Sequence, residues 1–328
     1  MRVVLIAPPA ENPWTGGHLF NARVAAHAPA GACELRSVPA SRLGDELANL
    51  PPEPAQVLAL DSLFLGDVPP SAWRGHRVVQ LVHSLPAARA PQADAALAVA
   101  AVCVTTSGFM AEQVRRRAGH ARVQVCRPGV QATLRVAAAA TGAAPIVLSV
   151  ANFERRKGHL QLLQVLTQLT DLAWEWQVAG DPGADPGYAR EFAAAVAGHG
   201  LAHRIHVLGR LDPDQVQQRM AAADVFALLS RGEPYGMVYA ESVASGTPVL
   251  AFADGGVPES VCDGVTGRLV AAGDLPAAAA ALRTLLVSPG LRQQMRHACA
   301  AAAAAFPGWD ACAAEFVACC ARGVEAAR

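Results

Sequence analysis

The 328-residue sequence has little charge and no long hydrophobic run. Charged residues make up 16% of the chain and hydrophobic residues 52%. This balance excludes a disordered or solvating chain, because ample apolar material is available for burial. The 27 basic and 27 acidic side chains cancel, so the basic excess typical of nucleic-acid-binding proteins is missing. We expect no nucleic-acid partner.

The apolar runs are too short for a bilayer or a signal peptide. The longest, residues 95–104, has about half the length that a membrane-spanning helix needs. The N-terminal run stops at Pro8 and Pro9 before it could form a signal-peptide core, and it predicts a first buried strand instead. We expect no transmembrane segment and a cytoplasmic protein, and peripheral membrane contact stays open.

Cysteine motifs for metal or redox chemistry are also missing. No C-x-x-C pair occurs, and the vicinal Cys319-Cys320 matches no usual zinc spacing. Because the neighbours are mostly alanine and valine, we expect reduced, packed thiols. The eight cysteines are Cys33, Cys103, Cys126, Cys262, Cys299, Cys312, Cys319 and Cys320.

Several common catalytic motifs are absent as well. No G-x-G-x-x-G follows the first strand, and neither a G-x-x-x-x-G-K-[ST] loop nor a G-x-S-x-G elbow occurs. These absences weaken dehydrogenase, nucleoside-triphosphatase and hydrolase interpretations. One metal-like match exists, Asp212-Pro213-Asp214, but an Asp before a proline and a helical pattern is typical of a helix N-cap. We therefore expect no metal site.

Short β-branched apolar runs alternate with helix-length segments, which is typical of parallel sheets covered by helices. Residues 136–144 carry neither pattern and predict a hinge. We expect an α/β chain of two Rossmann-like domains, residues 1–142 and 143–306, that face a central cleft. Residues 307–328 have the amphipathic pattern of a helix that crosses back to the first domain. Strands are expected at 3–7, 56–60, 78–82, 102–105, 123–126, 146–150, 176–179, 205–208, 225–228 and 249–252, and helices at 159–169, 188–197, 213–222, 238–244 and 309–322.

The stretch after the strand expected at 225–228 holds the strongest chemical signal. Gly236, Met237 and Val238 open a helix, so their free N–H groups would lie at the positive end of its dipole. Such a helix start is a ready site for a diphosphate or for sugar hydroxyls.

Two glutamates, Glu233 and Glu241, flank this helix start. On one continuous helix they would lie about 12 Å apart, so they could hold the two ends of one long ligand. A nucleotide-sugar is such a ligand. The alternative is a loop carboxylate and a helix-face carboxylate without a shared function.

These residues belong to a longer pattern that resembles glycosyltransferase family 4, the retaining enzymes of the GT-B fold. The hallmarks of that family are E-P-[FY]-G-x-x-x-x-E, then A-x-G-x-P-V and G-G-x-x-E, and this chain matches them at residues 233–241, 244–249 and 255–259. The resemblance runs over essentially the whole chain and is strongest from 147 to 270. It implies transfer of a hexose from a nucleoside diphosphate sugar, without a metal or a covalent intermediate.

The resemblance also implies roles for single residues. Glu233 would contact the transferred sugar, and Glu241 would accept hydrogen bonds from the ribose. The backbone at Gly236, Met237 and Val238 would hold sugar hydroxyls and phosphate. In addition, Lys157 would neutralise the diphosphate, because the leaving group gains charge in the transition state.

The chain departs from the family at Asn152, where many relatives carry an arginine five residues before the lysine. Arg156 or Arg155 could supply the missing charge, and the alternative is that both are only solvated. Arg210 follows the strand expected at 205–208 and would lie near the base of the donor.

In the first domain, Gly16 and Gly17 resemble the glycine pair that lies against the donor phosphates. His83, at the end of the strand expected at 78–82, matches a histidine that reaches the donor sugar. Asp61 ends the strand expected at 56–60, where it could bind acceptor or form a turn.

The donor nucleotide, UDP or GDP, stays open, and a small soluble acceptor is favoured over a lipid-linked one. No cofactor is expected beyond the donor substrate. Two other interpretations remain: a nucleotide-sugar epimerase or phosphorylase on the same fold, and a non-catalytic nucleotide-sugar-binding module.

Overall fold

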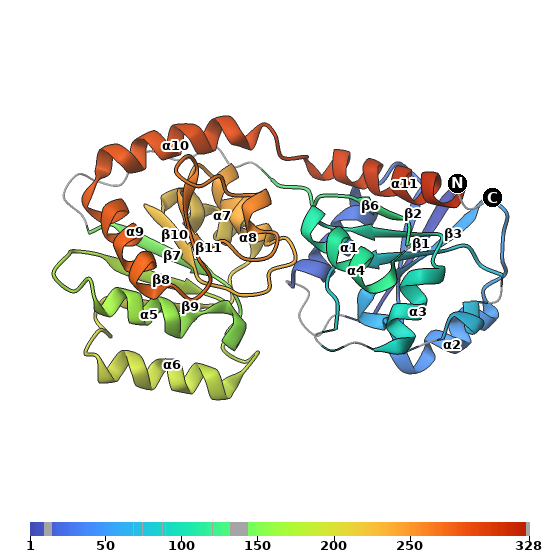
Figure 1. Cartoon of the computed structure of the whole chain (residues 1–328), viewed down its shortest axis with the longest axis horizontal. Coiled ribbons are helices and arrows are strands. Elements are labelled where there is room, and N and C mark those ends of the chain that lie inside the picture. Colours follow the sequence, from blue (N-terminus) through green and yellow to red (C-terminus); the bar gives the residue numbers. More distant parts are fainter. Residues whose placement is uncertain are drawn as a thin grey trace. The chain divides into compact units, whose positions relative to one another are not determined.

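The computed structural model describes residues 1–9, 15–67, 69–73, 75–86, 88, 90–119, 121–131 and 144–325 (Figure 1). The chain forms two compact units, Met1–Gly129 with Pro307–Arg328, and Val130–Phe306. Each unit contains one six-stranded parallel sheet, which confirms the α/β architecture with two Rossmann-like sheets. The hinge predicted at 136–144 lies almost entirely outside the described residues.

The first sheet has the strand order β2-β1-β3-β4-β5-β6. Its strands are β1 (Arg2–Ala7), β2 (Cys33–Ser37), β3 (Gln56–Asp61), β4 (Val78–Val82), β5 (Val102–Thr105) and β6 (Val123–Val125). Its helices are α1 (Gly16–His27), α2 (Ala40–Asn49), α3 (Pro91–Val99), α4 (Gly108–Ala118) and α11 (Trp309–Glu325). Every residue of β3 and β4 is buried, as expected for strands covered on both faces.

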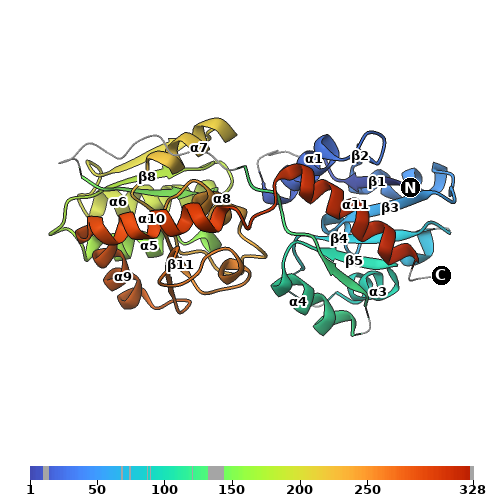
Figure 2. The same cartoon turned by 90° about the horizontal axis from the view of Figure 1, so that it is seen from above.

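Helices cover both faces of this sheet. On one face, Val4, Ile6 and Leu58 share an apolar cluster with side chains of α2, α3 and α4. On the other, α11 lies across the sheet beside α1 (Figure 2). Phe20 of α1 meets Phe316 of α11 edge to face, with 6.1 Å between ring centroids. The last helix of the chain therefore completes the core of the first unit.

The second sheet has the order β12-β11-β10-β7-β8-β9. Its strands are β7 (Ile146–Val150), β8 (Glu175–Ala179), β9 (Ile205–Gly209), β10 (Val225–Leu228), β11 (Val249–Phe252) and β12 (Gly267–Val270). Its helices are α5 (His159–Thr167), α6 (Pro186–Gly198), α7 (Pro213–Ala222), α8 (Met237–Ala244), α9 (Leu275–Val287) and α10 (Pro289–Ala303).

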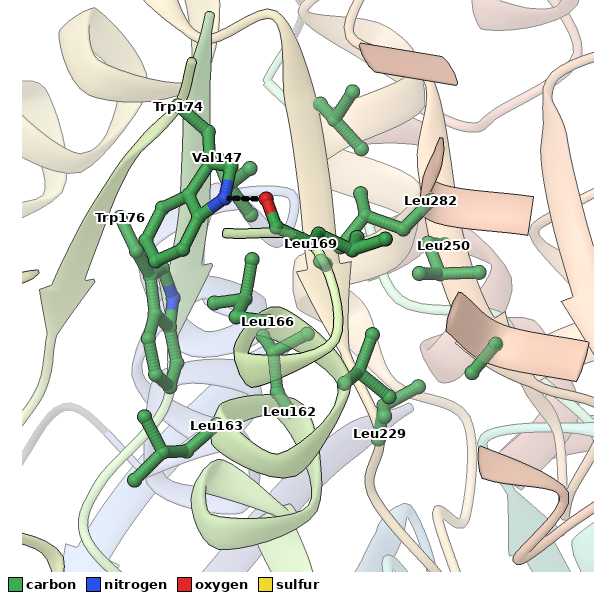
Figure 3. Packing of buried hydrophobic residues seen from close by; sticks show 14 of the residues in the cluster. Val147, Leu162, Leu163, Leu166, Leu169, Trp174, Trp176, Leu229, Leu250 and Leu282 are labelled. Carbon is green, nitrogen blue, oxygen red and sulfur yellow. Dashed lines mark hydrogen bonds between the residues drawn. The ribbon is translucent and has the colours of Figure 1, made fainter. Parts of the chain in front are cut away.

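Successive residues of β7 face opposite sides of this sheet, as the period of a strand requires. Val147 packs in one buried cluster and Leu148 in the other. In the first cluster, Trp174 and Trp176 lie against the leucines of α5, and the indole of Trp174 donates a hydrogen bond to the carbonyl of Leu169 at 2.8 Å (Figure 3). Buried apolar clusters on both faces of the sheet thus fix the positions of β7 and β10 at the centre of the unit.

The Asp212-Pro213-Asp214 segment is a helix N-terminus, as predicted. The Asp212 carboxylate accepts a hydrogen bond from the Gln215 N–H at 2.8 Å, and the Gln215 side chain accepts one from the Asp212 N–H at 3.1 Å. This reciprocal pair is a capping box, which explains why α7 begins at Pro213.

The cysteines are all free thiols, and most of them are packed as expected. Six are buried and Cys33 is half-buried, but Cys262 is exposed, so the prediction of a packed thiol is wrong there. Among the described residues, no helix is both long and apolar enough to span a membrane.

In both sheets, the strand order reverses at one point. It lies between β1 and β3 in the first sheet and between β7 and β10 in the second. Open α/β sheets bind ligands outside the carboxyl ends of their strands at such a point, because the flanking loops part there. The loops after these four strands are therefore the places to look for function.

Candidate functional site

In the second unit, the loops after β7 and β10 bring together an ion pair of Lys157 and Glu233. Lys157 ends the 3-10 turn Arg155–Lys157 that follows β7, and Glu233 follows β10. The Lys157 Nζ donates a hydrogen bond to the Glu233 Oε1 at 2.5 Å. The two residues are 76 positions apart in sequence, and adjacent parallel strands explain their contact.

Glu233 is only 5% exposed, yet its surroundings favour the charged form. Burial raises the pKa of the Glu233 carboxyl, but the charge and hydrogen bond of Lys157 and the charge of Arg156 outweigh burial and leave this pKa below its ordinary value. An ionised carboxylate and a lysine are thus fixed together at the reversal point of the sheet.

The glycines Gly255 and Gly256 pack against the backbone carbonyl of Glu233. Gly255 has a φ of +64°, and a Cβ atom there would lie 2.1 Å from the Glu233 carbonyl oxygen. The N–H of Gly256 donates a hydrogen bond to that same oxygen at 2.8 Å. The two glycines of the G-G-x-x-E motif therefore hold the loop that carries Glu233 in place through direct backbone contacts.

Gly236, Met237 and Val238 form the N-terminus of α8. Gly236 is the N-cap residue with a φ of +81°, and no side chain among the described residues caps this helix. The positive end of the helix is thus available for an anion or for hydroxyl groups. Glu241 lies one turn further along α8 and is half-buried.

The two arginines beside Lys157 point to different partners. Arg156 lies with its Nη1 3.7 Å from the Glu233 Oε1. Arg155 instead pairs with Glu191 of α6 at 2.6 Å, and its guanidinium lies over the ring of Tyr188, 5.3 Å from the centroid. Arg156 is therefore the arginine that adds charge at the ion pair.

Asn152 and Arg210 meet through Asp181, which follows β8. The Asn152 Oδ1 accepts a hydrogen bond from the Asp181 N–H at 3.1 Å, and the Asp181 carboxylate pairs with Arg210 at 2.6 Å. The hydrogen bond from Arg210 is the main reason that the pKa of Asp181 is lowered. Sequence reasoning missed Asp181, although its place directly after a predicted strand was an available signal.

In the first unit, Gly17 and His83 lie against each other, and Gly16 is exposed at the start of α1. A Cβ atom on Gly17 would lie 3.2 Å from the Cδ2 of His83, so the glycine lets α1 approach the imidazole. The His83 side chain is 12% exposed. Burial lowers the pKa of His83 despite the opposing charge of Asp61, so the neutral imidazole is favoured.

A buried network behind His83 escaped sequence reasoning. Asn21 donates a hydrogen bond to the Asp61 Oδ2 at 2.5 Å, and the His83 Nε2 lies 3.0 Å from the Asn21 Oδ1. Asp61 also accepts a hydrogen bond from the Leu63 N–H at 2.8 Å as the N-cap of a 3-10 turn. The expectation that Asp61 could form a turn is confirmed. Asn21 lies one helical turn after Gly17, which was the only sequence signal for it.

The described part of the chain contains no cluster of three or more His, Cys, Asp or Glu residues that could bind a metal ion. The charged groups at the reversal points are instead Lys157, Arg156 and Glu233 in the second unit and Asp61 in the first.

Comparison with known proteins places this chain among sugar-transferring enzymes. Residues 131–303 match the sequence model of the family described as Glycosyl transferases group 1. The D-inositol 3-phosphate glycosyltransferase of Corynebacterium diphtheriae is 32% identical over 200 residues, which cover 59% of this chain and 47% of that protein. That of Streptomyces coelicolor is 41% identical over 115 residues, which cover 35% and 25%. The matched part of the chain thus spans half or less of the length of these relatives.

Solved structures with a similar fold cover the whole chain. Sucrose-phosphate synthase from Thermosynechococcus elongatus superposes with a TM-score of 0.78 at 21% identity, over 100% of both chains. The Anabaena protein HepE, in complex with UDP and glucose, superposes with a TM-score of 0.75 at 18% identity, over 97% of this chain and 98% of that one. These similarities show the GT-B fold that the sequence resemblance implied. Because the family match covers more than half of its length, this chain belongs to the group 1 glycosyltransferases.

Proposed function

We propose that this chain is a retaining glycosyltransferase of family 4 that moves a hexose from a UDP- or GDP-linked sugar to a small soluble acceptor. The observation that carries the proposal is the partly buried ion pair of Lys157 and Glu233 at the reversal point of the second sheet. A chain that only folded would gain little from it, since replacing a buried ion pair with apolar residues is often neutral or stabilising.

Lys157 and Arg156 are the cations for the diphosphate in this proposal. The leaving nucleoside diphosphate gains negative charge as the sugar bond breaks, and fixed cations stabilise that charge without reorganisation. The free N–H groups at the start of α8 add partial positive charge to the same phosphates. Glu233 contacts the hexose, and Glu241 accepts hydrogen bonds from the ribose.

The reaction is a substitution at the anomeric carbon on the face that the leaving group occupied. The bond between that carbon and the phosphate oxygen breaks, the acceptor oxygen forms its bond on the same face, and the acceptor proton passes to the leaving phosphate. No metal ion and no cofactor take part beyond the donor. The proposal assigns the charge neutralisation to Lys157 and Arg156.

The titles and names of similar proteins support the choice of ligands. HepE was solved with UDP and with UDP-glucose, which are a nucleoside diphosphate and its hexose conjugate. The relatives named D-inositol 3-phosphate glycosyltransferase are named after a small phosphorylated acceptor. Both fit a site built from a cation pair and a helix N-terminus.

Thermal unfolding in the presence of UDP, GDP, ADP and their hexose conjugates tests the donor. A ligand at about a hundred times its dissociation constant stabilises the folded chain by roughly 2.7 kcal/mol. We expect one nucleotide to raise the unfolding temperature, and Lys157→Met to abolish the rise. A folded sample that responds to no nucleotide contradicts the proposal.

Product analysis by NMR then separates the alternatives with the nucleotide so identified. A glycoside with the anomeric configuration of the donor supports the proposal. A free epimerised sugar indicates an epimerase, a sugar phosphate formed from a glycoside indicates a phosphorylase, and binding without turnover indicates a non-catalytic module.

A further inference from the structure

The three side chains Asp61, Asn21 and His83 form a directed chain of hydrogen bonds within the first unit. Asp61 and Asn21 are 0% and 1% exposed, and His83 is the outermost member, at the carboxyl end of β4. Asp61 ends β3, Asn21 lies in α1 and His83 directly follows β4, so no single local turn or helix cap brings the three residues together.

The direction of each hydrogen bond follows from donor and acceptor chemistry. A carboxylate only accepts, and Asp61 accepts from the Leu63 N–H and from the Asn21 Nδ2. The amide of Asn21 is thereby oriented with its Oδ1 towards the His83 Nε2, 3.0 Å away. Because an amide oxygen also only accepts, the Nε2 must carry a proton.

The other ring nitrogen of His83 is then left as an acceptor. A neutral imidazole carries one N–H, and burial lowers the pKa of His83 and disfavours a second proton. Among the described residues, none lies within hydrogen-bond distance of the His83 Nδ1, and the side chain keeps 12% exposure. The lone pair of the His83 Nδ1 therefore has no hydrogen-bond partner among the described residues.

We propose that Asp61 and Asn21 are positioning residues, which hold the His83 proton on Nε2 and so present Nδ1 as a hydrogen-bond acceptor at the carboxyl end of β4. This inference rests on the geometry of the first unit and not on the proposed function.

The isosteric substitution Asp61→Asn tests whether the Asp61 carboxylate sets the tautomer. The new amide keeps its single oxygen for the Leu63 N–H and turns its NH₂ group towards Asn21. Asn21 must then rotate, present its oxygen to that group and donate its own NH₂ to the His83 Nε2. The imidazole proton consequently moves to Nδ1, while the shape of the network is unchanged.

Long-range ¹H–¹⁵N NMR spectra of histidine-labelled protein read the tautomer directly. The chain has ten histidines, and His83→Gln identifies the signals of His83 by their loss. We expect a protonated Nε2 in the native chain and a protonated Nδ1 in Asp61→Asn. The matched control Asp185→Asn removes a carboxylate that caps α6 in the second unit, and it leaves the His83 signals unchanged.

A protonated Nδ1 in the native chain overturns the proposal, and that spectrum needs no variant to fold. An unchanged tautomer in folded Asp61→Asn overturns it as well. Asn21→Ala provides an independent variant, because it removes the link and should yield a mixture of both tautomers.

Discussion

The Glu233 carboxylate stays ionised although its side chain is buried, because it pairs with Lys157. Burial alone would raise the pKa of the Glu233 carboxyl, and the contacts with Lys157, Arg156 and Ser230 hold this pKa low. The carboxylate is therefore ionised because of its partners and not because of solvent. Any ligand that draws Lys157 away must supply Glu233 with new hydrogen-bond donors, which hydroxyl groups of a sugar can do.

This pair predicts a specific loss of stability in acid. Because the folded-state pKa of Glu233 lies below its ordinary value of 4.5, the unfolded chain takes up the proton first as the pH falls. The stabilisation is complete above about pH 4.5 and is lost as the pH drops through the folded-state pKa. Urea unfolding at about pH 7 and about pH 4 should show a smaller pH dependence for Glu233→Gln than for the native chain. An identical dependence would contradict the low pKa.

The two neighbouring arginines predict different effects on ligand binding. Arg156→Ala removes the guanidinium beside Glu233 and should weaken nucleoside diphosphate binding by about tenfold, the usual contribution of a hydrogen bond to a charged group. Arg155→Ala is the matched control, since Arg155 pairs with Glu191 instead. Isothermal titration calorimetry measures both. Equal losses in the two variants would show that net charge alone, and not position, governs binding.

The site residues could be predicted from the sequence only where they belong to a recognisable motif. Glu233 and Lys157 are embedded in such motifs, and their contact follows once β7 and β10 are neighbours. Asn21 lies 40 and 62 positions from its partners Asp61 and His83, and no local pattern connects them. The choice between Arg155 and Arg156 was likewise out of reach, because it depends on where Glu191 lies on α6.

At the scale of elements, the loop that carries Glu233 depends on the Gly255-Gly256 turn. Gly255→Ala would place a methyl group 2.1 Å from the Glu233 carbonyl oxygen in addition to the strain of its positive φ. We expect a loss of more than about 2 kcal/mol in unfolding free energy together with impaired nucleotide binding, since the left-handed conformation alone costs about 1–2 kcal/mol.

Gly264→Ala is the matched control for that substitution. Gly264 has a φ of +75°, but no atom lies within 4 Å of an added Cβ. It should therefore lose only the conformational part, about 1–2 kcal/mol, and keep its affinity for the nucleotide. Urea unfolding and nucleotide titration measure both variants. Equal losses of affinity would show that the Gly255 turn does not position the Glu233 loop.

Most elements were predictable because their burial follows a simple pattern. Strands β4, β5, β7, β10 and β11 have the predicted bounds, since each is an apolar run buried on both faces. The prediction gave no bounds for α1, α2, α3, α4, α9 and α10, and it missed β2 and β12, each of which is one of the two edge strands of its sheet. Half of each strand or more is exposed or only partly buried, and residues such as Glu34, Arg36 and Arg268 hide the apolar alternation. Pairing with a neighbour, and not local composition, makes these segments strands.

At the scale of the whole molecule, α11 joins the end of the chain to its first unit. Phe316 is fully buried against Phe20 of α1. Phe316→Ala should destabilise the first unit by about 3–5 kcal/mol, the usual cost of removing a buried aromatic ring. Hydrogen exchange should accelerate in β1, β4 and β5 and stay unchanged in β7, β8 and β10. Uniform acceleration would instead show that the two units unfold together.

The return of α11 also determines when each unit can fold during synthesis. The first unit is interrupted after Gly129 and resumes at Pro307, whereas the Val130–Phe306 unit is continuous. At about 5–20 residues per second, a ribosome needs roughly 10–35 seconds to translate the intervening segment. Throughout that time the first sheet lacks α11, which covers one of its faces together with α1, so the second unit can reach its native state before the first. Nascent chains of this protein therefore expose an apolar sheet face near their N-terminus, which is a surface that chaperones at the ribosome bind.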